Sequence, residues 1–115
     1  MSNCVPYAIH IATGIDYEVV LEAVKRHGWD ERAGMTAVAG WCSLRSLGID
    51  APGMKRPGAK LTLAAFLPTL RRDRNYIIDV TQHWLAVKSG CAVDPARTHG
   101  RTLVRSYIEL QGSPV

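Results

Sequence analysis

The fold is decided by the stretch NYIIDVTQHWLAVKSGCAVD, which runs from Asn75 to Asp94. At Asn75 the apolar residues change from helical spacing to alternation with a period of two, which is typical of β-strands. We expect strands over residues 76–81, 83–88, 91–94 and 103–110. Ser89 and Gly90 are expected to form a two-residue hairpin turn between the second and third strands.

Helical spacing dominates the chain before Asn75. A first helix is expected to begin at Cys4, after Asn3 as the N-cap, and to end at Gly14. Further helices are expected over residues 17–27, 37–47 and 63–67, each preceded by an Asp or Thr that can cap it. Helices followed by consecutive strands indicate an α+β fold, with N-terminal helices packed on a C-terminal antiparallel sheet.

The third expected helix and the connection after it carry two more expectations. Val38, Trp41 and Cys42 are assigned to the buried side of the helix, with Leu44 as a further candidate, and Gly40 is expected to weaken it. The connection over residues 49–60 is rich in Gly and Pro, so it is expected to be irregular and to help shape any substrate pocket.

Size and composition indicate one domain spanning residues 1–115. The apolar fraction of 47% and the charged fraction of 21% are ordinary for a globular protein. No apolar run approaches the roughly 20 residues of a membrane span, and no basic region followed by an apolar core marks a signal peptide at the start. We therefore expect a cytoplasmic protein without a membrane partner; the sequence does not determine its oligomeric state.

The cysteines and histidines do not form a metal-binding pattern. The three cysteines lack C-x-x-C spacing, and the four histidines lack an H-x-x-x-H pair. This pattern fits neither a disulfide framework nor a zinc site, so we expect no metal and no cofactor.

The formal charge of +4 raises the question of a nucleic-acid partner. Basic residues gather at 55–56, at 71–74 and at Arg97, Arg101 and Arg105. Such clusters can bind phosphates, but no aromatic residues are interleaved with them as in single-strand binding proteins. We interpret them as solvated surface, which argues against nucleic acid as the partner.

Cys4 is the first candidate for chemistry. A thiol at a helix N-terminus faces the positive end of the helix dipole, which favours the nucleophilic thiolate. The alternative is that Cys4 is simply a small apolar residue near the end of the chain, because most free cysteines are inert.

His83 and Asp94 are placed together by counting outward from the hairpin turn. If Ser89 and Gly90 form the loop, Lys88 pairs with Cys91 and Asp94 comes opposite Leu85. Asp94 is then a diagonal neighbour of His83 on the same face of the sheet, within hydrogen-bonding reach. The alternatives are a strand-start histidine bonded to the backbone and a turn residue before Pro95. A carboxylate beside an imidazole fixes its tautomer and stabilises the imidazolium.

These segments resemble papain-like cysteine peptidases, in the compact form of the double-glycine leader peptidases of bacterial peptide exporters. That group carries Asp/Asn-Cys-Gly-Pro on its first helix, as NCVP does at residues 3–6, and later a His strand, a turn and an Asp, as residues 83–94 do. The chain is more similar still to small papain-like proteins encoded by tailed phages. These run from a Cys into Ala-Thr-Gly-x-x-Tyr, as residues 12–17 do, and end in a tyrosine-bearing strand, a His strand and a basic final strand.

The resemblance implies a papain-like fold with Cys4 as nucleophile, His83 as general base and Asp94 as the residue that orients His83. Two features depart from the family pattern. The oxyanion-hole glutamine of the family, several residues before its cysteine, has no counterpart here, and Gln82 is the candidate replacement. Val5 replaces the common glycine after the cysteine.

Two functions remain open from the sequence. One is a phage-encoded cysteine peptidase or related acyl-transfer hydrolase that acts on a peptide or isopeptide bond of a peptide or protein substrate. The other is a non-catalytic papain-like module that binds a host protein in the host cytoplasm, in host takeover or against host defence.

Overall fold

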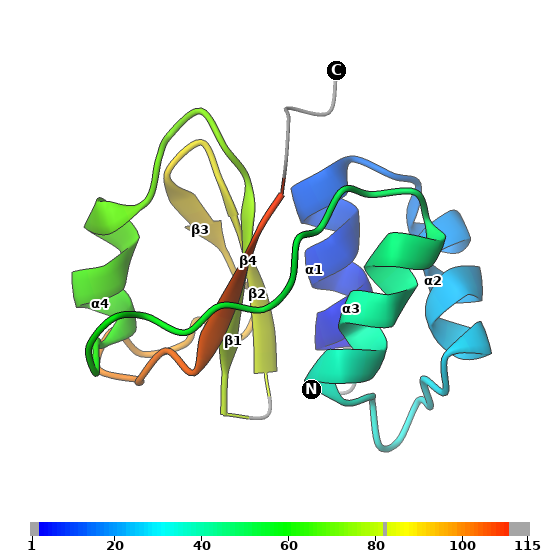
Figure 1. Cartoon of the computed structure of the whole chain (residues 1–115). Helices are drawn as coiled ribbons and strands as arrows, with labels where there is room; N and C mark the ends of the chain where they lie inside the picture. Colours follow the sequence, from blue (N-terminus) through cyan, green and yellow to red (C-terminus); the bar gives the residue numbers. More distant parts are fainter. Residues whose placement is uncertain (1–2, 82, 111–115) are drawn as a thin grey trace.

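The computed structural model describes residues 3–81 and 83–110 (Figure 1). Helices come first in the chain and the strands follow, as the sequence predicts. The helices are α1 Cys4–Thr13, α2 Tyr17–Arg26, α3 Ala37–Ser46 and α4 Leu63–Phe66, which continues into a 3-10 turn, η1, over Leu67–Thr69. The strands are β1 Tyr76–Val80, β2 His83–Lys88, β3 Cys91–Val93 and β4 Ser106–Glu109.

The four strands form one antiparallel sheet in the order β3-β2-β1-β4. Ser89 and Gly90 both have positive φ, 54° and 80°, as a type I′ hairpin turn requires. Lys88 pairs with Cys91, and Ala86 pairs with Val93. The predicted hairpin register is therefore confirmed.

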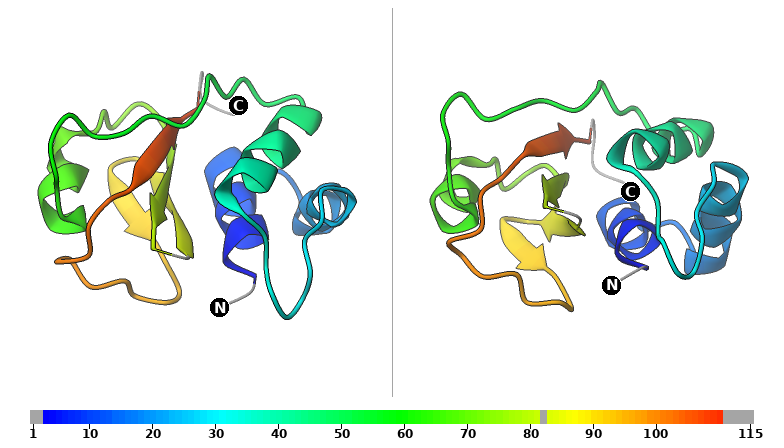
Figure 2. Two further views of the ribbon diagram at one scale, coloured as in Figure 1. Left: turned by 60° about the horizontal axis from the view of Figure 1, so that its bottom comes forward. Right: turned by 90° about the horizontal axis from the view of Figure 1, so that it is seen from below.

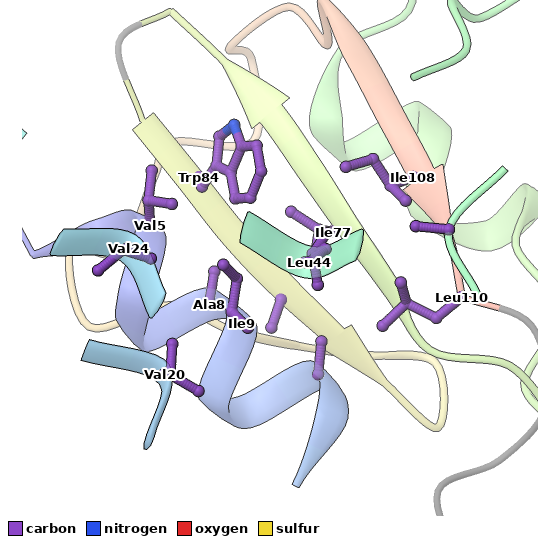
Figure 3. Packing of buried hydrophobic residues seen from close by; sticks show 13 residues of the cluster. Val5, Ala8, Ile9, Val20, Val24, Leu44, Ile77, Trp84, Ile108 and Leu110 are labelled. Atoms are coloured by element: carbon purple, nitrogen blue, oxygen red, sulfur yellow. The ribbon is translucent and has the colours of Figure 1, made fainter. Parts of the chain in front are cut away.

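The sheet lies between two layers of helices (Figures 1 and 2). Helices α1 and α3 cover one face, where Trp84 and Ala86 from β2 pack among apolar residues of the helices (Figure 3), and α2 packs on α1 and α3 on the side away from the sheet (Figure 2). The short α4 covers the other face, where Phe66 packs with Ile78 and Leu85. The sequence predicts the first layer, and the second layer is a finding of the structure.

The orientation of α1 is fixed at its C-terminal end. Gly14 ends the helix in the left-handed conformation with φ 76°, and its N–H donates to the His10 carbonyl. The buried Asn75 side chain, just before β1, donates to the Ala12 carbonyl at 2.9 Å. Because β1 and β2 are antiparallel, this bond ties the end of α1 to the far end of β2. The N-terminus of α1, with Cys4, therefore lies toward the start of β2.

The predicted buried face of α3 is right for Leu44, which is fully buried, and in part for Trp41, which packs against the core, but wrong for Val38. Val38 is 59% exposed, and Cys42 is only partly buried. Besides Leu44, the buried residues of the helix are Gly40 and Ser43, which the apolar pattern does not predict. Gly40 faces the Trp84 ring so closely that a Cβ at this position would lie 2.6 Å from the ring atom Cη2. The missing side chain sets the rotation of the helix, which a count of apolar residues does not detect.

Three strands are shorter than predicted: β1 ends at Val80 rather than at residue 81, and β3 and β4 are also shorter, with β4 ending at Glu109 rather than at residue 110. β3 ends at Val93, one residue before Asp94. β4 begins at Ser106 rather than at residue 103, because Leu103 makes only an isolated bridge to Thr62 and is half-exposed. Among the described helices, none combines the length and apolar character needed to cross a membrane.

Candidate functional site

Cys4 is the first residue of α1, and its side chain is partly buried. Asn3 occupies the N-cap position, but its side chain makes no capping hydrogen bond, contrary to expectation. The backbone N–H of Tyr7 donates to the Asn3 carbonyl at 3.1 Å, and Pro6 has no N–H. Because the Asn3 side chain does not cap the helix, it accepts no hydrogen bond from the backbone N–H groups of the first turn. The positive end of the helix dipole therefore lies beside the Cys4 thiol.

His83 opens β2 and is held by Asp94 from the loop after β3. The ring atom Nε2 lies 2.8 Å from Asp94 Oδ1, and the two side chains are only 13% and 8% exposed. The hairpin register predicts this contact, and the structure confirms it. The bond uses Nε2, so Nδ1 is the ring nitrogen that remains for exchanging a proton with another group.

The Asp94 carboxylate is held on both oxygens. The backbone N–H of Ala96 donates to Oδ1 at 3.1 Å, and that of Thr98 donates to Oδ2 at 2.8 Å. Burial raises the pKa of Asp94, but hydrogen bonds from Thr98 and His83 outweigh it and leave the pKa below its ordinary value. Asp94 thus stays ionised at neutral pH, as a group that orients a histidine and stabilises its cationic form requires.

Cys4 and His83 line the same two cavities. One, of about 250 Å³, has largely apolar walls that include Tyr7, Leu85 and Val93. The other, of about 570 Å³, is lined on its far side by charged residues, among them Arg32, Asp79 and Arg105. The structure therefore brings the predicted nucleophile and base together in the lining of two cavities of different character.

Asp79 is a residue of this site to which the sequence gives no primary role. It lies on β1, half-buried, and its side chain accepts a hydrogen bond from Ser106 Oγ at 3.0 Å. Burial raises the pKa of Asp79, and the Ser106 hydrogen bond and the charge of Arg105 only partly offset this. The nearby Trp84 indole N–H is buried, and among the described residues no atom meets hydrogen-bond geometry with it. The register of β1 could place Asp79 on the α1 side of the sheet, but only the three-dimensional packing shows its cavity.

Asp79→Asn is expected to stabilise the fold at pH 7–8. The raised pKa means that Asp79 holds its proton more tightly in the folded protein than in the unfolded chain. The folded state therefore loses stability as the pH rises above about 3.9, the ordinary pKa of an aspartate. Asparagine removes this cost and can still accept from Ser106. Thermal unfolding should show a higher midpoint for the variant at pH 7.5, and the difference should shrink by pH 3.5. A variant less stable than the natural chain at pH 7.5 would contradict this account.

Gln82 and the other three histidines are the remaining residues with possible chemistry. Gln82 lies outside the described residues. His10 and His27 each place Nδ1 against a backbone carbonyl, and His99 accepts from the backbone N–H of Arg101, so these histidines have local structural partners. Over residues 3–81 and 83–110, no group of three His, Cys, Asp or Glu side chains could hold a metal ion.

Comparisons of the chain with protein-family models, with characterised proteins and with solved structures give no significant match.

Proposed function

We propose that this protein is a papain-like cysteine peptidase or a related acyl-transfer hydrolase, which attacks a peptide or isopeptide bond through Cys4. One observation carries the proposal. Cys4 at the start of α1 and His83, held by Asp94 at 2.8 Å, line the same two cavities. A nucleophile, a base and a group that orients the base are the parts that acyl transfer needs.

In the proposed reaction, His83 accepts the thiol proton of Cys4 on the ring nitrogen that Asp94 does not hold. The sulfur bonds to the substrate carbonyl carbon, and the carbonyl oxygen becomes an oxyanion. The intermediate collapses as the C–N bond breaks, and the leaving amine takes the proton from His83. Water then attacks the thioester with His83 as base, releasing the carboxylic acid and restoring the thiol.

The oxyanion requires hydrogen-bond donors at the start of α1. The backbone N–H of Cys4 supplies one, because the Asn3 side chain does not cap this turn. Gln82, next to His83 in the chain, is proposed as the second donor. Loss of one such donor typically costs about 10²–10³ in rate, so Gln82→Ala provides a direct measure of its role.

The fold gives the proposal general support. A nucleophile on the first helix, packed across an antiparallel sheet that carries the base, is the arrangement that the resemblance to papain-like peptidases implies. Fold alone does not establish activity. The test must therefore address the thiol.

We expect iodoacetamide to alkylate Cys4 faster than Cys42 or Cys91 at about pH 6, a pH at which an ordinary thiol is almost fully protonated. Cys91 is the stringent internal control, because it is exposed whereas Cys4 is partly buried. Peptide mass mapping after timed labelling gives the three rates in one sample. Turnover is assayed in parallel with a peptide library, and Cys4→Ser provides the background.

The outcomes separate the two functions. Fast alkylation of Cys4 together with Cys4-dependent cleavage supports the peptidase. Labelling of Cys4 no faster than Cys91 contradicts an activated thiol and favours the binding module. A reactive Cys4 without cleavage of any library peptide contradicts hydrolysis and directs attention to the oxyanion donors.

A further inference from the structure

The charged cavity beside Cys4 adjoins a third cavity. The cavity of about 570 Å³ and a neighbouring one of about 720 Å³ share three lining residues: Ala37, Asp79 and Arg105. The second is walled by the irregular connection after α3, through Met54, Pro57 and Lys60. The two adjoining cavities are together called the basic cleft; Cys4 and His83 line its first part and not its second.

Four cations line the basic cleft, and they come from distant parts of the sequence. Arg32 lies in the loop before α3, Arg56 and Lys60 lie in the connection after α3, and Arg105 lies just before β4. All four are exposed. In the described part of the chain, none of them is in an ion pair within 4 Å, whereas Arg71 and Arg74 of another basic cluster pair with Asp73 and Glu109. The four side chains therefore present their charge without an ion pair within 4 Å among the described residues, although the Asp30 carboxylate accepts from the backbone N–H of Arg32 and Arg105 acts electrostatically on Asp79.

Asp79 is the one carboxyl group among the residues that line the basic cleft. It lies half-buried at the sheet, is bonded by Ser106, and is opposed by the four exposed cations. The balance of charge in the cleft is therefore positive, and its complement is an anionic chain.

We propose that the basic cleft binds an acidic segment of the polypeptide substrate, next to the bond that Cys4 attacks. This inference rests on the proposed function, since it assigns the substrate class of the same site. Glutamate or aspartate side chains would pair with Arg32 and Arg105 near Cys4, and with Arg56 and Lys60 farther along. Arginine suits this role because its planar fork binds carboxylates through two parallel hydrogen bonds.

Two features favour an acidic peptide over a nucleic acid. The exposed cations are not interleaved with exposed aromatic rings, since the one aromatic residue among the lining residues of the cleft is the buried Trp84. Bases would therefore have no stacking surface. Asp79 would also repel a regular row of phosphates, whereas it can accept from the backbone N–H of a peptide.

Binding is tested by fluorescence anisotropy with labelled twelve-residue peptides of alternating Glu and Ala, and with matched peptides in which Gln or Lys replaces Glu. The Glu peptide should bind to the natural chain more than about tenfold tighter than the Gln peptide, and its affinity should fall as salt rises. The double variant Arg32→Gln/Arg105→Gln should weaken it by about tenfold or more. Arg56→Gln/Lys60→Gln should also weaken it.

The matched control is Lys25→Gln/Lys88→Gln, which removes the same charge from exposed positions that do not line the cleft. The control should bind the Glu peptide nearly as the natural chain does. Equal losses in the control and the cleft variants would overturn the proposal, because a general charge effect would then explain the binding. A single-stranded twelve-residue oligothymidylate that binds as tightly as the Glu peptide, with the same variant dependence, would also overturn it.

The position of the peptide is tested separately from catalysis. Bound Glu peptide should slow the iodoacetamide labelling of Cys4 and leave that of Cys91 unchanged. Binding without protection of Cys4 would overturn the placement beside the nucleophile. These measurements do not depend on turnover. A protein that cleaves no peptide but binds the Glu peptide through the cleft would contradict the proposed function and still support the cleft as a binding site for an acidic peptide.

Discussion

Replacing His83 by alanine is expected to lower peptide cleavage by about 10²–10⁴-fold, the usual contribution of a positioned general base. The variant loses the group that takes the proton from Cys4 and returns it to the leaving amine. Alkylation of Cys4 at pH 6 should fall as well, because the variant lacks the imidazole that takes the thiol proton. Labelling of Cys91 should not change.

The matched control is His27→Ala at the end of α2, where the ring bonds to the Ala23 carbonyl and does not line either cavity. It should retain the reactivity of Cys4. If His83→Ala and His27→Ala label Cys4 at the same rate, His83 is not the base, and the proposed mechanism fails. Because both variants keep Cys4 and α1, any difference between them reports the imidazole rather than the end of the helix.

Asp94 variants separate the orientation of His83 from its presence. Asp94→Ala should lower cleavage strongly, while Asp94→Asn should lower it less, because an amide oxygen can still accept from the ring.

The lowered pKa of Asp94 also means that its ionised form stabilises the fold above about pH 4, and that this contribution is lost as the pH falls below that value. Asp94→Asn should therefore lose less stability than the natural chain between pH 4 and pH 2.

The contact between His83 and Asp94 could be predicted from the sequence because a two-residue turn fixes the register of a hairpin. Positive φ at Ser89 and Gly90 closes the turn, and side-chain alternation then places both residues on one face. The first helix was predictable for a similar reason, since Pro6 near its start and Gly14 at its end are local signals. Local turn and cap chemistry thus placed the candidate nucleophile and base on their elements.

The basic cleft could not be predicted in this way. Its cations lie in three segments separated by up to about seventy residues, and the sequence groups Arg105 with Arg97 and Arg101 rather than with Arg32. Their meeting depends on how α3 and the connection after it pack against the sheet. No local pattern encodes that packing, because Gly40 sets it by lacking a side chain.

Gly40→Ala is therefore expected to destabilise the protein, whereas helix propensity alone predicts that it would stabilise it. In an open helix, alanine would stabilise by about 1 kcal/mol relative to glycine. Here the new Cβ would lie 2.6 Å from Cη2 of Trp84 and 3.0 Å from Cγ1 of Val5. Both neighbours are buried, and the rigid Trp84 ring cannot move without disturbing β2. We expect Gly40→Ala to lower the free energy of unfolding, and Gly40→Val to lower it further, in the range of about 1–3 kcal/mol that overpacking costs.

Urea unfolding monitored by tryptophan fluorescence measures these changes, with Gly58→Ala as the matched control. Gly58 has no atom within 4 Å of an added Cβ, and its φ is not positive, so alanine should be neutral or slightly stabilising there. Because Trp84 follows His83 directly and lines both cavities with Cys4, displacement of its ring by Gly40→Val should also slow Cys4 alkylation at pH 6. If Gly40→Ala stabilised the protein as helix propensity predicts, α3 could not pack this closely on Trp84, and the wall it gives to the basic cleft would have to lie elsewhere.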